Sequence, residues 1–249
     1  MTESIESLAR QVVAELNALA DPGRADGERR YFKGTINNIG VTLPKIQAVE
    51  KRFCRDLAKT WSVDQAMEFC ETLLAMRVFE VSLLALEFLE RFAERLGPTE
   101  FDRFERWLDD DWCDNWAAVD SLCPHVVGPV LRNNPELGSR VRAWAGSGNR
   151  WLRRASAVTL VLLLRKGEFL DLAYEIAAVL ISDKSDDLVQ KGNGWMLREA
   201  GATDPVRLER FLLAHGPDIP RTTLRYAIEK FPAERRAHLL TATRVPRGE

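Results

Sequence analysis

The sequence predicts an all-helical protein in which antiparallel helices pack as successive pairs. Apolar residues recur at spacings of three and four along almost the whole chain, and the first predicted helix carries Ile5, Leu8, Val12, Leu16 and Leu19 on one face. No segment shows the apolar-polar alternation of a strand. Pairs of predicted helices recur about every 35 to 40 residues. These observations favour a stacked solenoid. A helical bundle is the alternative architecture, because it would show the same pattern.

Start and stop signals place the helices of the first half of the chain. Pro44 suits the first turn of a helix, where its missing N–H has no intrahelical partner to lose. Ser62 and Gln65 have the spacing of a capping box, and Gly97 followed by Pro98 ends a long apolar segment. After the first helix, the predicted helices cover residues 43–58, 66–74, 79–96 and 100–108.

In the second half, breaks at glycine and proline separate shorter helices. The expected helices cover residues 115–127, 135–145, 151–164, 169–181, 188–200, 205–214, 222–231 and 233–241. Their period is loose but close to that of HEAT-type repeats. No linker divides the chain, so we expect one helical-repeat domain over residues 1–243 and a flexible tail over residues 244–249.

Composition limits the classes of function. Hydrophobic residues make up 46% and charged residues 29% of the 249 residues, as in ordinary soluble proteins. The N-terminal segment lacks the basic flank and apolar stretch of a signal peptide, and the apolar run 155–164 is too short to cross a bilayer. The four cysteines form no Cys-x-x-Cys pair and lie far from the three histidines. We therefore expect a cytoplasmic protein with buried thiols, no metal and no membrane partner.

The net charge of −2 conceals an uneven distribution. Residues 132–166 carry eight basic side chains against the single acid Glu136, whereas acids dominate residues 100–120. A chain that is nearly neutral overall can still present a basic face to phosphates. Two solvated helix faces are the alternative interpretation of the same charges.

Three segments combine a tryptophan with a charged group at helical spacing. Trp116 and Asp120 are four residues apart, and Trp151 and Arg154 are three apart, so each pair shares a helix face. In the third segment Trp195 precedes Arg198 and follows Gly192 and Gly194. These glycines mark either a helix start or a close approach to the backbone. Each tryptophan, taken alone, is more often a core residue than part of a site.

Taken together, these segments resemble the AlkD-type DNA alkylation-repair family, and the resemblance extends from the first helix to about residue 240. Its most specific strings are residues 116–120 (WAAVD) followed by Gly128, residues 151–155 (WLRRA) and residues 191–199 (KGNGWMLRE). Residues 205–211 and 221–227 also resemble the family pattern. Two departures stand out: Ala117 occupies a position that is often acidic, and Asn193 replaces a hydrophobic residue before Gly194.

The resemblance implies a curved solenoid of HEAT-like antiparallel helix pairs that holds duplex DNA in a basic concave groove. It implies hydrolysis of the N-glycosidic bond of cationic alkylated purines, 3-alkyladenine and 7-alkylguanine. Asp120 is then the catalytic carboxylate, and Trp116, Trp195 and Tyr31 contact the lesion or its sugar. Arg154 contacts the DNA backbone, and the nearby basic residues add affinity for phosphates: these are Arg150, Arg153, Lys191 and Arg198.

This chemistry suits these residue types. An alkylated purine cation is a good leaving group, and positive charge moves to the deoxyribose as the bond breaks. A carboxylate beside the sugar stabilises that transition state, and indole faces attract cationic bases. The sequence offers no lysine that suggests a Schiff base, so we expect a monofunctional hydrolase without cofactor, acting as a monomer on alkylated double-stranded DNA. A neutral lesion such as 8-oxoguanine should be a poor substrate.

Two other functions fit the same fold. A family paralogue without catalysis would bind damaged or branched DNA in the same groove, and base release separates the two hypotheses. A protein-interaction scaffold is the second alternative, with the acidic segment 100–114 as a docking face. Duplex affinity that falls with salt would distinguish the DNA-binding functions from the scaffold.

Overall fold

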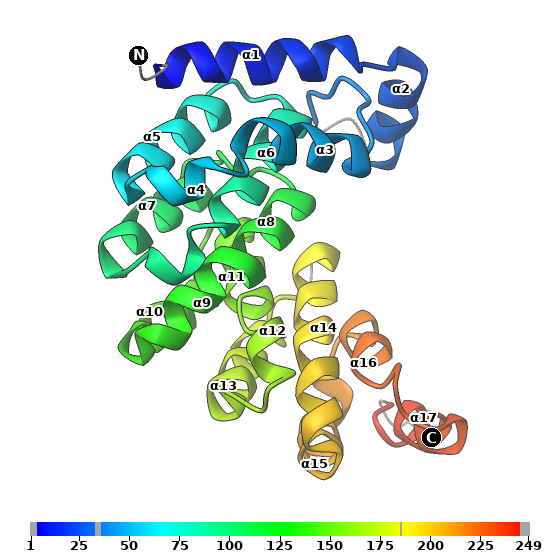
Figure 1. Ribbon diagram of the computed structural model, residues 1–249. Helices are drawn as coiled ribbons and strands as arrows, with labels where there is room; N and C mark the ends of the chain where they lie inside the picture. The colour runs from blue at the N-terminus through cyan, green and yellow to red at the C-terminus, as the bar shows by residue number, and fades with distance from the viewer. Residues whose placement is uncertain (1–3, 33–35, 185, 245–249) are drawn as a thin grey trace. The chain divides into compact units, whose positions relative to one another are not determined.

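The computed structural model describes residues 4–32, 36–184 and 186–244, and every regular element in these ranges is a helix (Figure 1). The predicted all-helical class is therefore confirmed. The curvature of a solenoid and its concave groove stay predictions. In the described ranges no helix is long and apolar enough to cross a membrane.

The chain divides into two compact units, Met1–Val130 and Leu131–Glu249. Stacked repeats contact mainly their neighbours, so such a division also arises within one repeat domain. The single domain over residues 1–243 stays a prediction. Of the expected tail, residues 245–249 lie outside the described residues, and the Arg244 N–H donates to the carbonyl of Thr241 at 3.1 Å.

The first unit is built around α6 (Phe79–Glu90), which packs against α3, α5 and α8. Nine of the twelve α6 residues are buried. Nearby, Phe69, Phe88 and Trp61 meet edge to face with ring centroids 5.1 to 6.0 Å apart. The surrounding elements are α1 (Ile5–Ala18), α2 (Pro22–Tyr31), α3 (Leu43–Cys54), α4 (Leu57–Thr60), α5 (Val63–Leu74), η1 (Ala93–Arg95), α7 (Pro98–Asp109), α8 (Trp116–Leu122) and η2 (Cys123–Val127), followed by α9 (Gly128–Asn133).

The second unit is built around its longest helix, α14 (Asp187–Thr203), which packs against α11, α12, α13, α15 and α16. Buried Glu199 joins three segments, because it accepts hydrogen bonds from Arg165 at 3.1 Å and Lys230 at 2.9 Å. The other elements are η3 (Pro135–Leu137), α10 (Gly138–Trp144), α11 (Arg150–Val158), α12 (Val161–Leu164), α13 (Leu170–Leu180), α15 (Pro205–His215), η4 (Gly216–Asp218), α16 (Arg221–Ala227) and α17 (Ala233–Ala242).

Several predicted helices are divided in the structure. The helix expected over residues 43–58 forms α3 and α4, and that over 79–96 forms α6 and η1. The helix expected over 115–127 forms α8 and then a π-helical turn, η2. Pro124 has no N–H for the carbonyl four residues earlier, so it interrupts the α-helical ladder at this point.

The helix α2 has no counterpart among the predicted helices, because its sequence PGRADGERRY lacks an apolar stripe. Ala25 is its one buried residue. The remaining signals are local: Asp21 accepts the Arg24 N–H at 3.0 Å as the N-cap, and Pro22 occupies the first turn. Capping and tertiary contacts therefore hold a helix that periodicity does not indicate.

The glycines of α14 lie inside the helix, where neighbouring helices approach closely. A methyl group on Gly194 would lie 2.5 Å from Cβ of Tyr226 and 2.8 Å from the Thr223 carbonyl. One on Gly201 would lie 2.2 Å from Cδ2 of Leu208. Of the two interpretations of Gly192 and Gly194, the close approach is correct for Gly194.

We predict that Gly194→Ala lowers the free energy of unfolding by about 1 to 3 kcal/mol, because the added methyl group overpacks the α14–α16 contact. Gly27→Ala is the matched control. Its methyl group would meet nothing within 4 Å, so better helix propensity should stabilise α2 by about 0.5 to 1 kcal/mol. Urea denaturation measures both, and equal effects of the two changes would contradict the packing argument.

Candidate functional site

The start of α8 presents two of the predicted site residues. Asn115 is buried, and its side-chain oxygen accepts the Ala118 N–H at 2.9 Å, so it caps the helix. Trp116 and Asp120 follow on one face, and both side chains are half-buried. The N-cap therefore sets where the indole and the carboxylate emerge.

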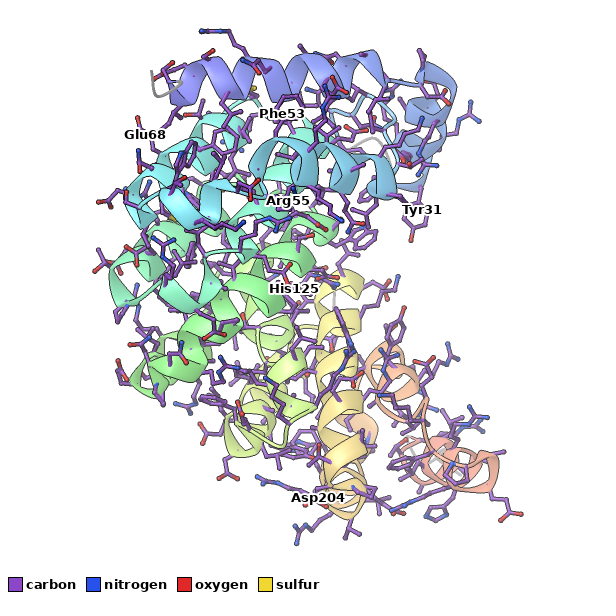
Figure 2. The ribbon with its side chains drawn as sticks, in the orientation of Figure 1. Tyr31, Phe53, Arg55, Glu68, His125 and Asp204 are labelled. Carbon is purple, nitrogen blue, oxygen red and sulfur yellow. The ribbon has the colours of Figure 1, made fainter. Side chains whose placement is uncertain are left out.

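Aromatic rings from α2 and α6 surround Trp116. The Phe32 ring stacks on the indole with centroids 5.2 Å apart and an angle of 5° between the planes. Tyr31 meets Trp116 edge to face at 6.2 Å, and Phe79 supports Phe32 at 5.2 Å. Tyr31 is 72% exposed and projects from the end of α2 in Figure 2. The indole is thereby fixed on one side while a tyrosine stands beside it in solvent.

These rings and Asp120 line one cleft of about 430 Å³. It thus brings together Tyr31, Trp116 and Asp120 from the predicted site. Ala117 also lines this cleft. Its remaining lining residues, none of which the sequence analysis selected for the site, are Arg24, Glu28, Phe32, Val41, Leu43, Ile46, Phe79, Leu83, Glu87 and Ser121.

Acidic side chains outnumber basic ones in the cleft lining. Arg24 pairs with Glu28 at 2.8 Å, and Glu28 also accepts a hydrogen bond from Asn38. Glu87 accepts hydrogen bonds from the neutral amide of Gln47 at 3.0 and 3.3 Å. With Asp120, the lining carries three carboxylates and one guanidinium. Such a cleft favours a cation over an anion.

A buried carboxylate holds the wall of the cleft. Glu80 is fully buried and accepts the backbone N–H groups of Ile39, Gly40 and Val41 at 2.6 to 3.1 Å. Gly40 has φ +84°, and a methyl group there would lie 2.1 Å from the Asp21 carbonyl. This segment therefore needs glycine, and Glu80 ties it to α6 beside the aromatic rings.

Arg154 lies in the second unit as a buried side chain. It is 5% exposed, and its Nη1 donates to the carbonyl of Leu188. A methyl group on Gly192 would lie 3.4 Å from Arg154, an ordinary van der Waals distance, so the arginine packs directly against α14. The guanidinium thus links α11 to the first turn of α14.

The other arginines of this segment are paired with acids that follow α13. Arg150 bonds Asp186 at 2.8 Å, and Arg153 bonds Asp183 at 2.7 Å and the carbonyls of residues 147 and 148. The Arg150 side chain is 49% exposed, whereas that of Arg153 is 18% exposed. Arg150 is therefore the more accessible of the two.

Lys191, Trp195 and Arg198 form a half-buried stripe along α14. Lys191 pairs with Asp187 at 2.8 Å, and Arg198 bonds Glu229. Within the described ranges the Trp195 Nε1–H has no hydrogen-bond partner. The structure therefore places an indole between two cations, as the spacing of the three residues predicts.

Asn193 is a buried polar residue whose whole amide group is unpaired among the described residues. Its side chain is fully buried, and neither its amide nitrogen nor its oxygen has a hydrogen-bond partner in the part of the chain that the structure describes. Leaving such a group unpaired costs about 1 to 3 kcal/mol. Asn193 is therefore a local destabilising feature directly before Gly194 and Trp195.

The chain offers little support for metal or thiolate chemistry. The four cysteines are free and buried, as expected, and burial raises the pKa of Cys54 and Cys113 to about 12. Among the described residues no group of three or more His, Cys, Asp or Glu side chains is arranged to hold a metal ion. Asp120 and the aromatic rings remain the chemically useful groups of the cleft.

The fold and this cleft define an all-helical protein with a carboxylate beside an aromatic wall. The family model described as DNA alkylation repair enzyme matches residues 12–231. The chain belongs to this DNA alkylation repair enzyme family.

A solved structure supports the fold. It is titled "Predicted DNA alkylation repair enzyme from Enterococcus faecalis" and is 19% identical, with a TM-score of 0.73. The match covers 86% of this chain and 97% of the other. At this identity the likeness shows the shared fold alone. A search of curated proteins found no significant match.

We predict that Glu80→Gln lowers the free energy of unfolding by about 2 to 4 kcal/mol, because a neutral amide oxygen accepts the three N–H groups more weakly and the amide NH2 faces the Ile39 N–H. Glu15→Gln removes a carboxylate from a solvent-exposed pair with Arg52 and should cost less than about 1 kcal/mol. Chemical denaturation of both variants tests this. A Glu80→Gln protein as stable as Glu15→Gln would refute the anchoring role.

For Asn193→Leu we predict the opposite sign, a gain of about 1 kcal/mol or more, because an apolar side chain of the same branched shape replaces an amide that is unpaired among the described residues. Thermal unfolding followed by circular dichroism measures the change. Gln190→Leu serves as the control. The Gln190 amide donates to the carbonyls of Leu180 and Asp183 at 2.7 and 2.6 Å, so its loss should destabilise. A lower melting temperature for Asn193→Leu would show that the amide is satisfied in solution.

Proposed function

We propose that this protein is a monofunctional DNA glycosylase that hydrolyses the N-glycosidic bond of cationic alkylated purines, 3-alkyladenine and 7-alkylguanine, in duplex DNA. The observation that carries the proposal is the cleft in which Asp120 lies beside the Trp116 indole, with Tyr31 exposed at its edge. Membership of the DNA alkylation repair enzyme family supplies the substrate class. The base specificity and the mechanism are our inference.

The role proposed for Asp120 is electrostatic. As the glycosidic bond breaks, the leaving purine becomes neutral and positive charge develops on the deoxyribose. A carboxylate about 4 Å from that charge contributes roughly 4 kcal/mol at an effective dielectric constant of 20. If most of this arises only in the transition state, the rate increases on the order of 10² to 10³-fold. Asp120 also has the chemistry to orient the attacking water.

The aromatic rings suit a cationic ligand. Because Phe32 already stacks on one face of Trp116, the indole is held in a fixed orientation toward the cleft. Ring faces attract positive charge through their quadrupole, by about 0.5 to 2 kcal/mol. The surplus of carboxylates over cations in the lining favours the same ligand charge. A neutral lesion lacks both attractions.

Phosphate contacts are proposed for the second unit. Arg150 and Lys191 are the most accessible of the predicted contacts, with side chains 49% and 39% exposed. Their acidic partners, Asp186 and Asp187, hold them in place and reduce their net charge. Trp195 is proposed as the second lesion contact, flanked by Lys191 and Arg198. Arg153 and Arg154, which are less exposed, are proposed to shape this surface and reach phosphates at its margin.

The test is base release from duplex DNA treated with a methylating agent, quantified by mass spectrometry. We expect the wild-type protein to release 7-methylguanine or 3-methyladenine and Asp120→Asn to lose at least about tenfold in rate, because the amide carries no charge to stabilise the sugar cation. Release of 8-oxoguanine from a second duplex that carries this neutral lesion should stay at background. Borohydride should trap no covalent complex.

Glu68→Gln is the matched control. It removes a carboxylate from α5, on the far side of the first unit from Tyr31 (Figure 2), and should leave the rate unchanged. A folded wild-type protein that binds DNA and releases no base would refute the enzyme assignment and leave a non-catalytic DNA binder. Equal losses in both variants would refute the specific role of Asp120.

A further inference from the structure

A second cavity, of about 450 Å³, lies within the second unit and is separate from the residues of the proposed glycosylase site. It is bounded by the start of α14, by η4 with the start of α16, and by the residues that end α17. The residues that line it are Lys184, Asp187, Gln190, Pro217, Asp218, Ile219, Pro220, Arg221, Thr222, Thr243 and Arg244. Three of them are cations and two are carboxylates.

Arg221 lines this cavity, and among the described residues its guanidinium has no acidic partner. Its Nη1 donates to the Thr243 hydroxyl and its Nη2 to the Leu240 carbonyl, both at 3.0 Å. Both acceptors are neutral, and no carboxylate among the described residues lies within ion-pair distance of Arg221. The two hydrogen bonds orient the guanidinium and leave its charge uncompensated.

Other cations stand close to Arg221. The pKa of Arg221 is lowered, first by burial and then by the positive charges of Arg244 and Arg225. Arg244 lines the same cavity and likewise has no ion pair within residues 4–32, 36–184 and 186–244. Like charges held together in this way repel each other, and a bound anion relieves that repulsion.

The two carboxylates of the cavity are engaged elsewhere. Asp187 pairs with Lys191 at 2.8 Å and accepts the Thr222 hydroxyl at 2.9 Å. Asp218 pairs with Lys184 at 3.4 Å. Neither compensates the arginines, so the cavity carries a local positive charge between groups that are already hydrogen-bonded.

We propose that this cavity binds a phosphate group through the guanidinium groups of Arg221 and Arg244. Arginine binds phosphate oxygens with two parallel N–H donors, and two guanidinium groups match the charge of a phosphate better than a single lysine does. The cavity is much larger than one phosphate group, as a backbone phosphodiester with its flanking sugars requires. We therefore infer that the phosphate group belongs to a DNA backbone rather than to a free phosphate ion. This step rests on the proposed DNA binding.

The first experiment uses inorganic phosphate alone. We expect phosphate to raise the melting temperature of the wild-type protein above that in chloride at equal ionic strength, because it binds the folded state. The rise should disappear in Arg244→Gln, whose exposed side chain makes no hydrogen bond or ion pair with the described residues. Arg236→Gln, which removes an exposed arginine from the neighbouring α17, should keep the full rise. No phosphate-specific rise in the wild-type protein would overturn the proposal.

The second experiment measures duplex DNA affinity against salt. Arg244→Gln should weaken binding at low salt on the order of tenfold and reduce the slope of log K against log salt by about 1, as expected for one lost phosphate contact. Arg221→Lys keeps the charge and loses the two-donor geometry, so it should weaken affinity with less change in slope. Arg236→Gln should leave both quantities near the wild-type values.

The outcomes separate this proposal from the glycosylase. A phosphate-dependent rise that Arg244→Gln abolishes, together with unchanged DNA affinity, would support a phosphate site and identify its ligand as a free phosphate. If Arg244→Gln binds duplex DNA more weakly but the wild-type protein releases no base, the phosphate site is supported and the glycosylase activity is refuted. If Arg244→Gln and Arg236→Gln behave alike in both experiments, the proposed site is wrong.

Discussion

The buried carboxylate of Glu80 is the interaction on which the candidate site depends. It accepts the N–H groups of three consecutive residues, Ile39 to Val41, and so fixes an irregular segment that has no helical ladder of its own. The same segment bonds back to both neighbouring helices, through the Asp21 N–H to the Ile39 carbonyl and the Phe79 N–H to the Asn37 carbonyl. Because α2 has only one buried residue, these bonds, rather than an apolar face, hold it beside α8. The stacking of Phe32 on Trp116 follows from that placement.

In the first unit a buried charge holds the proposed site residues in place, whereas in the second unit close packing of helices does so. In α14 the glycine at 194 lets the α16 backbone approach the helix, and Arg154 of α11 packs against it near Gly192, so the stripe that carries Trp195 is held from two sides. Asn193 lies between these glycines, its amide has no hydrogen-bond partner in the described residues, and it opposes that tight packing. In this short segment, Asn193, which destabilises the core, therefore lies two residues before Trp195, a proposed lesion contact. Such local conflicts are typical of functional segments.

The helical class, most of the helices and three of the residues that line one cleft are predictable from the sequence. Periodicity and spacing are local, so Trp116 and Asp120 share a face on any helix that contains them both. The helix α2, Phe32, Phe79 and the acidic lining of the cleft are not predictable in this way, since they depend on contacts between segments about 40 to 90 residues apart in the chain. The one available signal was local, the Asp21–Pro22 start of a helix. The breaks at residues 55 and 91 carried no glycine or proline to mark them.

That this chain is helical and carries an indole and a carboxylate at a fixed helical offset can be derived from the amino-acid sequence, because local stereochemistry sets both. The family resemblance can be derived from it as well, since that depends on strings of adjacent residues. Only the tertiary structure decided which arginines are buried or paired and which cations lack a counter-charge. It likewise decided which aromatic rings stand around Trp116. These properties depend on distances across the fold, where a side chain loses water and gains its neighbours together, and no spacing along the chain specifies them.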